Sequence, residues 1–364
     1  MSIIYGVLGL VVMIIIHEFG HFLAARLVGV EVERFSVGFG KVLASYKTKR
    51  TEYALSLIPL GGYVKMKGEN KKSADLKDIK GAFFAQPVYK RMIIVFAGPF
   101  FNILSAVIFI AFAYTMGVPS LAPNIGKVLK NSSAYTAGIK KDDTILSINN
   151  QPIKTWQDLS REIKMYPNKQ IVIRLKRNGN ILSINAEPKG KHINDLLGYS
   201  KYVGILGIVP SGDTVKLRYS PIESLYQGVK KTIYITKITL LGLVRLLEHA
   251  IPTSNLGGPI MIVDVASKAA QSGLAAFLVF ASIISINLGI LNLLPIPILD
   301  GGHLMFFTIE AIRRKPVSER AQEIFQNVGL AILLALMLFA FFNDFKRYGV
   351  TKYINGKIEH IEKK

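Results

Sequence analysis

The chain has 364 residues, half of them hydrophobic and only 19% charged. A mean hydropathy of +0.35, with a charged share below the roughly 25% of soluble domains, excludes an ordinary soluble enzyme and favours a membrane protein. The net charge of +21 suits contact with anionic lipid headgroups, and without a nucleic-acid-binding motif we expect no nucleic-acid partner. The chain has no cysteine, so any metal ion must be held by His and carboxylate ligands.

Four apolar segments are long enough to cross a bilayer, which takes about 20 residues. They cover residues 3–28, 92–118, 269–299 and 324–342. The loops after the first and third segments are rich in Lys and Arg, whereas neither residue precedes the first segment. The positive-inside rule therefore predicts that both loops are cytoplasmic and that both termini lie outside. The N-terminal segment lacks the basic start and cleavage site of a signal peptide, so we expect it to be retained.

The first apolar segment contains the pentapeptide HEFGH, which places His17, Glu18 and His21 inside a predicted span. On a helix, residues four apart share a face, so His17 and His21 can hold one Zn²⁺, and Glu18 can accept a proton from the attacking water. Ionisable side chains within a bilayer cost at least about 2.5 kcal/mol each, and a bound cation offsets that cost. A chance match to the motif is the alternative; the position inside a span favours the metal site.

The basic loop after the first span contains the stretch IPLGGYVKM. We expect Gly61 and Gly62 to make a turn, and Tyr63 and Val64 to belong to a strand with an exposed edge. Such an edge can bind an extended peptide as an added strand. It could therefore hold a substrate whose helix has unwound locally, which is required before water can reach a peptide carbonyl.

A soluble segment, residues 122–188, follows the second span. TILSINN is typical of a strand, residues 156–165 have helical spacing of apolar side chains, and Asn178-Gly179 between alternating segments is a strong hairpin signal. Long domains cross membranes largely regardless of their charge, so the topology above places this segment outside the cytoplasm. Residues 220–248 mix apolar and basic side chains with a helical period, which predicts an amphipathic helix.

The third span ends in NLLPIPILDGGH, where Asp300 is the first acidic residue after a long uncharged run. Pro295 and Pro297 exclude a regular helix, and broken backbone at membrane depth is tolerated only against protein or a water-filled cavity. A catalytic zinc needs a third protein ligand and an open position. We expect Asp300 to join the two histidines of the first span. His303 is a rival ligand, although a loop histidine is the preferred interpretation.

HEFGH combined with NLLPIPILDG resembles the site-2 protease family of intramembrane zinc proteases. The stretches IPLGGYVKM and PVYKRMIIVFAGPFFN, together with residues 122–188, resemble the bacterial regulator-of-sigma-E protease branch. The resemblance implies that His17, His21 and Asp300 bind zinc and that Glu18 is the general base. It also implies substrate-binding roles for Asn102, Asn292, Gly61, Gly62, Tyr63 and Val64.

The soluble segment resembles a circularly permuted PDZ domain, with Asp142 where many relatives have glycine. The implied fold is a polytopic α-helical membrane protein with about four transmembrane helices, a membrane-re-entrant β element and one inserted extracytoplasmic PDZ domain. The predicted regions are an N-terminal membrane core (1–120), the PDZ domain (121–190), a linker with the amphipathic helix (191–268), a C-terminal membrane core (269–343) and a basic tail (344–364).

The implied function is regulated intramembrane proteolysis of single-span proteins in the bacterial inner membrane. The resemblance suggests a pre-cut anti-sigma factor or a signal-peptide remnant as substrate, with the PDZ domain, on the periplasmic side, binding a peptide or the substrate ectodomain. One alternative is a metal or ion transporter, since intramembrane His and acidic residues also mark ion pathways; no inverted repeat supports it. A catalytically inactive scaffold is another, and the intact set of candidate catalytic residues argues against it.

Overall fold

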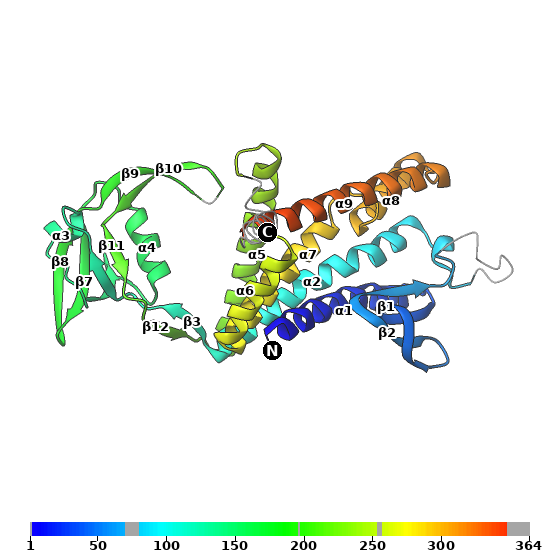
Figure 1. Ribbon diagram of the computed structural model, residues 1–364, viewed down its shortest axis with the longest axis horizontal. Coiled ribbons are helices and arrows are strands. Elements are labelled where there is room, and N and C mark those ends of the chain that lie inside the picture. Colours follow the sequence, from blue (N-terminus) through cyan, green and yellow to red (C-terminus); the bar gives the residue numbers. More distant parts are fainter. Residues whose placement is uncertain (1, 70–79, 196, 253–256, 348–364) are drawn as a thin grey trace, which may run out of the picture. The chain divides into compact units, whose positions relative to one another are not determined.

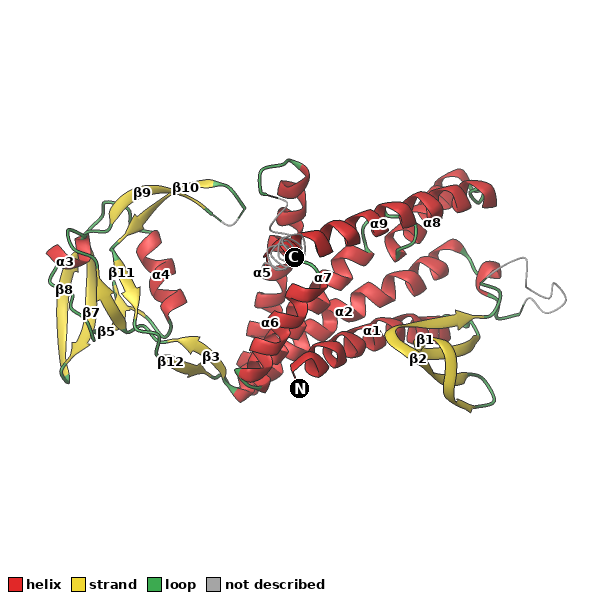
Figure 2. Cartoon of the chain, viewed as in Figure 1, coloured by secondary structure: helices red, strands yellow, loops and turns green. Residues whose placement is uncertain are grey.

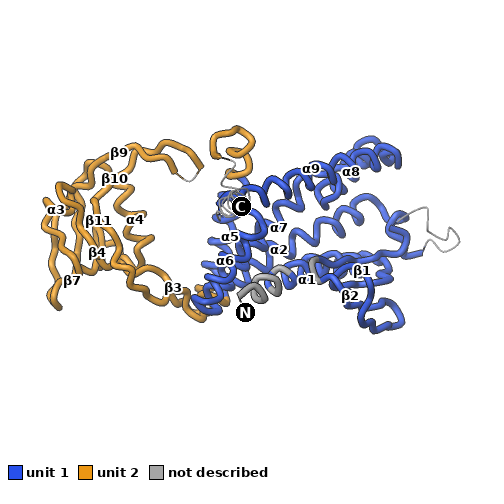
Figure 3. The backbone as a smooth tube through the Cα atoms, in the orientation of Figure 1, with its two compact units in different colours: residues 1–111, 225–240, 253–364 blue, residues 112–224, 241–252 orange. Residues whose placement is uncertain are grey.

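The computed structural model describes residues 2–69, 80–195, 197–252 and 257–347 (Figure 1). The chain forms two compact units (Figure 3). The first comprises Met1–Ala111, Leu225–Leu240 and Thr253–Lys364, and the second comprises Phe112–Ser224 and Leu241–Pro252. The first unit consists mainly of helices and the second mainly of strands (Figure 2). The predicted PDZ region, residues 121–190, falls within the second unit.

Long apolar helices dominate the first unit. They are α1 (Ser2–Leu27), α2 (Val88–Met116), α5 (Pro221–Leu247, shared between the two units), α6 (Pro259–Gln271), α7 (Leu274–Asn292), α8 (Asp300–Arg313) and α9 (Glu319–Arg347). Among the described residues, α2, α7 and α9 are long and apolar enough to cross a membrane. Helix α1 covers the first predicted span, and the amphipathic helix predicted near residue 220 is α5. The number of membrane crossings and their direction remain predictions.

Glycines allow the helices of the first unit to approach closely. A Cβ atom on Gly20 of α1 would lie 2.5 Å from the Ala97 carbonyl oxygen of α2, and one on Gly289 of α7 would lie 2.9 Å from the Pro99 oxygen. Small residues at such crossings bring backbones together, which is how helices pack within lipid. The segment of α2 around Pro99 is therefore held between α1 and α7.

The element predicted to be re-entrant is a two-stranded sheet of long, bent strands, β1 (Val32–Lys47) and β2 (Glu52–Met66). The first half of β1, residues 34–37, pairs on one side with residues 52–55 and on the other with residues 62–65. The end of β2 consequently forms an outer edge, and no described strand pairs with its free side.

Gly61 and Gly62, where the sequence predicts a turn, lie inside β2, where Gly62 pairs with Val37. Residues 52–55 run parallel to residues 34–37 and residues 62–65 run antiparallel to them, so β2 reverses its direction just before Gly62. A separate turn at residues 48–51 joins β1 to β2. A Cβ on Gly62 would lie 2.8 Å from the Ser36 carbonyl oxygen and 3.3 Å from Cγ of Glu18. Glycine at this position thus permits close packing of the strand against β1 and α1, directly after the reversal of β2 between Leu55 and Gly62.

One buried hydrophobic cluster joins α1, this sheet and α2. Its members are Phe22, Ala24, Ala25, Val30, Val32, Val64, Met66, Ile94 and Ala97. Because all three elements share this core, the strand edge and the HEFGH helix are fixed relative to each other. The cluster therefore supplies a rigid base for the candidate site.

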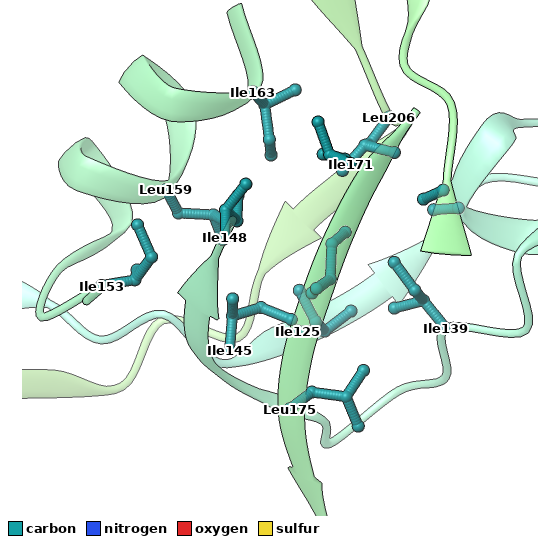
Figure 4. Close-up of a cluster of buried hydrophobic side chains, with 13 residues drawn as sticks. Ile125, Ile139, Ile145, Ile148, Ile153, Leu159, Ile163, Ile171, Leu175 and Leu206 are labelled. Atoms are coloured by element: carbon teal, nitrogen blue, oxygen red, sulfur yellow. The ribbon is translucent and has the colours of Figure 1, made fainter. Parts of the chain in front are cut away.

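The second unit has its own core, with a four-stranded sheet in the order β6-β5-β7-β8. The strands of the unit are β3 (Val118–Leu121), β4 (Ile125–Val128), β5 (Thr144–Ile148), β6 (Gln151–Pro152), β7 (Ile171–Arg177), β8 (Asn180–Ala186), β9 (Lys189–Asn194), β10 (Ser200–Ile205), β11 (Ile208–Pro210) and β12 (Thr214–Leu217). Helices α3 (Ser133–Thr136) and α4 (Trp156–Lys164) complete it. Alternate strand residues and one face of α4 bury isoleucine and leucine side chains together (Figure 4).

Two local predictions for this unit are confirmed. Strands β7 and β8 form the hairpin, with Asn178 and Gly179 both at positive φ as its turn requires. The predicted helix is α4, which begins with a capping box between Thr155 and Asp158. Asp142, which replaces a common glycine, has φ +69°; aspartate tolerates this left-handed conformation better than most residues.

Candidate metal centre

Helix α1 presents His17 and His21 on one face, one turn apart. The two Nε2 atoms are 3.1 Å apart, and each residue is only 8% exposed. The Nδ1–H of His21 donates a hydrogen bond of 2.8 Å to the Ile94 carbonyl oxygen on α2. This bond fixes the ring and leaves the lone pair of a neutral His21 on Nε2, turned towards His17.

Asp300 reaches the histidines because the chain breaks between α7 and α8. Helix α7 ends at Asn292 and α8 begins at Asp300, which confirms the predicted break at the two prolines. Gly301 packs directly against the Leu293 and Leu294 carbonyl oxygens, leaving no room for a side chain. The turn therefore folds tightly under the start of α8 and directs Asp300 into the bundle.

Pro297 of this turn packs against two helices. A Cβ on Gly329 of α9 would lie 3.1 Å from Cδ of Pro297, and Gly302 of α8 packs against Ile296 and Pro297. The irregular backbone at Ile296 and Pro297 is covered by protein, as expected of broken backbone among apolar helices. Packing from two helices thus holds the segment that carries Asp300.

A charged pair on another face of α8 also fixes its position. The Arg91 guanidinium on α2 donates hydrogen bonds of 2.6 and 3.2 Å to the two carboxylate oxygens of Glu310. The side chains are only 12% and 17% exposed, and the guanidinium lies 4.8 Å from the centroid of the Phe307 ring. A bidentate pair of this kind has a defined geometry, so α2 and α8 are locked together.

Three lone-pair-bearing groups converge where these elements meet. Asp300 Oδ2 lies 3.1 Å from His17 Nε2, and Asp300 Oδ1 lies 3.5 Å from His21 Nε2. Asp300 Oδ2 is buried and makes no hydrogen bond within the described chain. A carboxylate beside an imidazole lone pair is stable in a buried site only when positive charge lies between them. The arrangement fits a bound cation.

The donor set fits zinc. Two histidine nitrogens and one carboxylate oxygen, within 4.8 Å of one another, are the three protein ligands of a zinc site with an open fourth position. Gly98 of α2 leaves space at the cluster, since a Cβ there would lie 2.5 Å from Cε1 of His21. The ligand cluster found in the described chain does not include His303.

Glu18 stands beside the cluster without belonging to it. It is close enough to His17, His21 and Asp300 to interact with them electrostatically, and the Val64 backbone N–H lies within hydrogen-bonding reach of its carboxylate. A carboxylate next to three candidate ligands, but not among them, is placed to exchange protons with a reacting group.

The two predicted asparagines both lie at the cluster. Asn102 of α2 is fully buried, with its amide nitrogen 3.1 Å from His17 Nδ1. Asn292 at the end of α7 places its amide nitrogen 3.3 Å from His17 Nε2. Asn292 thus lies on the metal-facing side of the ring, and Asn102 lies behind it.

The four residues of β2 predicted to bind substrate are Gly61, Gly62, Tyr63 and Val64, and the last three belong to the outer edge next to Glu18. Gly62 lies against its side chain, and Val64 belongs to the core shared with α1. The Tyr63 hydroxyl accepts a hydrogen bond of 3.2 Å from the Arg34 guanidinium, and its ring stacks on Phe39. The edge is therefore rigid and adjacent to the candidate base.

Sequence reasoning missed three contributors to the centre. Gly98 supplies space, the Ile94 carbonyl orients His21, and the Ser105–Ser285 pair joins α2 to α7 behind the site. Gly98 lies in the AGP stretch used for the resemblance, so its position offered a signal. A main-chain carbonyl carries no sequence signal of its own.

Comparisons with known proteins agree with this geometry. The profile described as peptidase family M50 matches residues 5–336. A candidate zinc metalloprotease of Campylobacter jejuni is 41% identical over 337 residues, which cover 92% of this chain and 90% of the relative. The regulator of sigma E protease of Haemophilus influenzae is 32% identical over 432 residues, which cover 94% of this chain and 98% of the relative.

Among solved structures, the PDZ domain of an SdrC-like protein from Listeria innocua is similar to a portion of the chain. It is 20% identical and covers 24% of this chain and 92% of that domain, with a TM-score of 0.20. A score this low supports no conclusion about the domain.

A membrane protein with a buried His, His and Asp centre is therefore matched along most of its length to metalloproteases. The chain belongs to peptidase family M50, the site-2 protease family, whose members are membrane-embedded and zinc-dependent. The predicted resemblance, enzyme class and cofactor are confirmed.

Proposed function

We propose that this protein is an endopeptidase that cuts single-span membrane proteins within or near the bilayer. The observation that carries the proposal is the convergence of His17, His21 and Asp300 in a buried site, with Glu18 beside them. The helices around the site include α2 and α7, which are apolar enough to cross a membrane. Water and an unwound peptide must therefore be brought to this centre.

In the proposed reaction, His17, His21 and Asp300 hold zinc. When bound, zinc polarises the scissile carbonyl and lowers the pKa of water. Glu18 accepts the proton of the attacking water and later delivers it to the nitrogen of the leaving amine. The Asn292 amide, beside the metal-facing edge of His17, is placed to donate a hydrogen bond to the carbonyl oxygen of the substrate as negative charge develops there.

The outer edge of β2, from Gly62 to Met66, is the proposed substrate-binding strand. Its free side lies beside Glu18, so a substrate segment added there as a strand would have its backbone held near the centre. An extended conformation exposes peptide carbonyls that a helix would shield. Tyr63 and Val64 would then set the register of the bound segment.

We further propose that the second unit contains a PDZ domain on the periplasmic side of a bacterial inner membrane. Its four-stranded sheet, the helix α4 and the sequence resemblance support this assignment. It would bind a peptide or exclude substrates with large outer domains, so that a prior cut is required. The name of the Haemophilus influenzae relative favours a pre-cut anti-sigma factor as substrate; a signal-peptide remnant is the other candidate.

The test is Glu18→Gln in the purified full-length protein. We expect one bound zinc per chain and at least about 100-fold slower cleavage of a model transmembrane substrate, because the proton acceptor is lost while the ligands remain. Glu33→Gln is the matched control, since Glu33 is exposed and forms a solvent-exposed pair with Lys65. Undiminished cleavage by Glu18→Gln would remove Glu18 from the mechanism.

The substrate-binding strand can be tested by disulfide cross-linking, since the chain has no native cysteine. In a Glu18→Gln background, Tyr63→Cys should cross-link to a substrate carrying cysteine near its cleavage site. Tyr135→Cys on the exposed surface of the second unit serves as the control. Equal cross-linking from both positions would contradict strand addition at β2.

A further inference from the structure

Asn102 occupies a buried position that links the metal centre to the helix packing behind it. The residue is 0% exposed. Its main-chain carbonyl oxygen accepts hydrogen bonds of 2.8 Å from the hydroxyls of both Ser105 and Ser285. Its side chain points the other way and meets His17 Nδ1 at 3.1 Å. The backbone of Asn102 is thus clamped between α2 and α7, which fixes where its side chain can reach.

The proton on His17 determines which amide atom meets the ring. A zinc-binding imidazole presents its lone pair at the coordinating nitrogen, here Nε2, so the ring proton lies on Nδ1. If the Asn102 amine faced Nδ1, two donors would be opposed and the buried Oδ1 would have no partner within the described chain. The two ends of an amide have nearly the same shape. Turning the group over lets Oδ1 accept the Nδ1–H of His17.

The two histidines are then supported from the same helix in different ways. His21 Nδ1–H donates to a main-chain carbonyl at Ile94, eight residues before Asn102 on α2. His17 donates to a side chain, which a substitution can remove. Such outer partners fix the rotation of a metal-binding ring and raise its basicity, and their loss costs about 10- to 100-fold in metal affinity.

We propose that Asn102 is a positioning residue for the zinc site, accepting the Nδ1–H of His17 and holding Nε2 towards the metal. The inference rests on the proposed role of His17 as a ligand. It differs from the substrate-binding role expected from the sequence, because a fully buried side chain engaged with His17 presents no surface to a peptide. Asn292, on the opposite side of the same ring, keeps the substrate-facing role.

The test compares Asn102→Leu with Asn102→Asp in the full-length protein purified in micelles. Asn102→Leu keeps the approximate shape but removes the acceptor, so we expect zinc affinity, measured by competition with a chromophoric chelator, to fall about 10- to 100-fold. Asn102→Asp keeps an acceptor oxygen and should recover most of that loss. The absorption spectrum of the cobalt-substituted protein should change in Asn102→Leu and return towards that of the parent in Asn102→Asp.

A control separates positioning from packing. Ser105→Ala removes one hydroxyl from the Asn102 carbonyl but leaves the side chain facing His17, so zinc affinity should change less than about 3-fold. A purely structural role would lower the unfolding temperature of the zinc-free protein in Asn102→Leu while leaving zinc affinity unchanged. A substrate-binding role would raise KM at unchanged zinc affinity. Either result would overturn the proposal, as would an Asn102→Asp variant that binds zinc as weakly as Asn102→Leu.

An incorrect ligand set would give a different result from an incorrect role for Asn102. His17→Ala should reduce zinc affinity far more than Asn102→Leu, because a ligand rather than its support is lost. If His17→Ala retains zinc with parent affinity, the proposed ligand set is wrong. If His17→Ala loses zinc and Asn102→Leu does not, the ligand set stands and the role of Asn102 is wrong.

Discussion

Replacing Gly98 with alanine would place a methyl group where the imidazole rings stand. The added Cβ would lie 2.5 Å from Cε1 of His21 and 2.9 Å from Cε1 of His17. Real Cβ atoms essentially never approach below 3.0 Å, and ordinary van der Waals contact begins at 3.4 Å. The His21 ring would have to move by about 0.9 Å, the difference between 3.4 and 2.5 Å, unless α2 itself moved away.

A shift of this size exceeds what a zinc site tolerates. Ligand distances are held to within about 0.2 Å, and a misplacement of about 1 Å can cost roughly 100-fold in rate. We therefore expect Gly98→Ala to weaken zinc binding about 100-fold, equivalent to about 2.8 kcal/mol. Alanine favours a helix over glycine by about 1 kcal/mol, so intrinsic helix propensity does not oppose folding of α2.

The assay is zinc titration of the stripped, purified protein against a chromophoric chelator, followed by cleavage of a model transmembrane substrate at limiting zinc. Gly242→Ala on α5 is the matched control, because the nearest atom to its Cβ would be 3.8 Å away. It makes the same chemical change in a helix without a clash and should bind zinc like the parent. Parent-like zinc affinity in Gly98→Ala would refute the placement of Gly98 against the two candidate ligands His17 and His21.

Further predictions concern the packing around the site, and unfolding in micelles measures their stability effects. Arg91→Ala should destabilise the protein by about 3 kcal/mol because Glu310 loses its buried partner. The double exchange Arg91→Glu with Glu310→Arg should recover some of this loss. Unchanged stability in Arg91→Ala would contradict a stabilising role for the ion pair between α2 and α8. Asp344→Ala leaves three backbone N–H groups at the start of α6 without their acceptor, which should cost about 1 to 3 kcal/mol of stability each. Asp344→Asn keeps one acceptor oxygen and should cost less. Equal losses of stability in the two variants would contradict a capping role of Asp344 at the start of α6. Leu175→Ala should lower the free energy of unfolding of the second unit by about 2 to 5 kcal/mol without changing zinc affinity. A loss of zinc affinity would contradict the independence of the metal centre from the core of the second unit.

Local patterns were sufficient for much of the candidate site. The four-residue spacing of His17 and His21 requires only a helix to bring them onto one face, and α1 provides it. Pro295 and Pro297, two residues apart, each lack a backbone N–H donor and disfavour a regular helix, and the chain breaks there. The Asn-Gly turn of the second unit is similarly a local preference for positive φ.

Gly61 and Gly62 show what local reasoning leaves open. Glycine suits both a turn and a close approach between backbones, and the sequence does not distinguish the two uses. The structure shows the close approach, because Gly62 packs against the Ser36 carbonyl and the Glu18 side chain, and it places a reversal of β2 just before this residue. A strand edge beside the candidate base follows from that packing rather than from the residues of the strand.

The sequence alone indicated the zinc-dependent chemistry of this protein, since the candidate ligands, the candidate base and the apolar segments around them are all visible in it. Only the tertiary structure decided how Asp300 approaches histidines more than 270 residues away, and that Asn102 lies behind His17 rather than in front of it. The physical reason is that these relations depend on close helix crossings at glycine and on main-chain hydrogen bonds. Such contacts are set by the packing of distant segments, which no periodicity or motif spacing encodes.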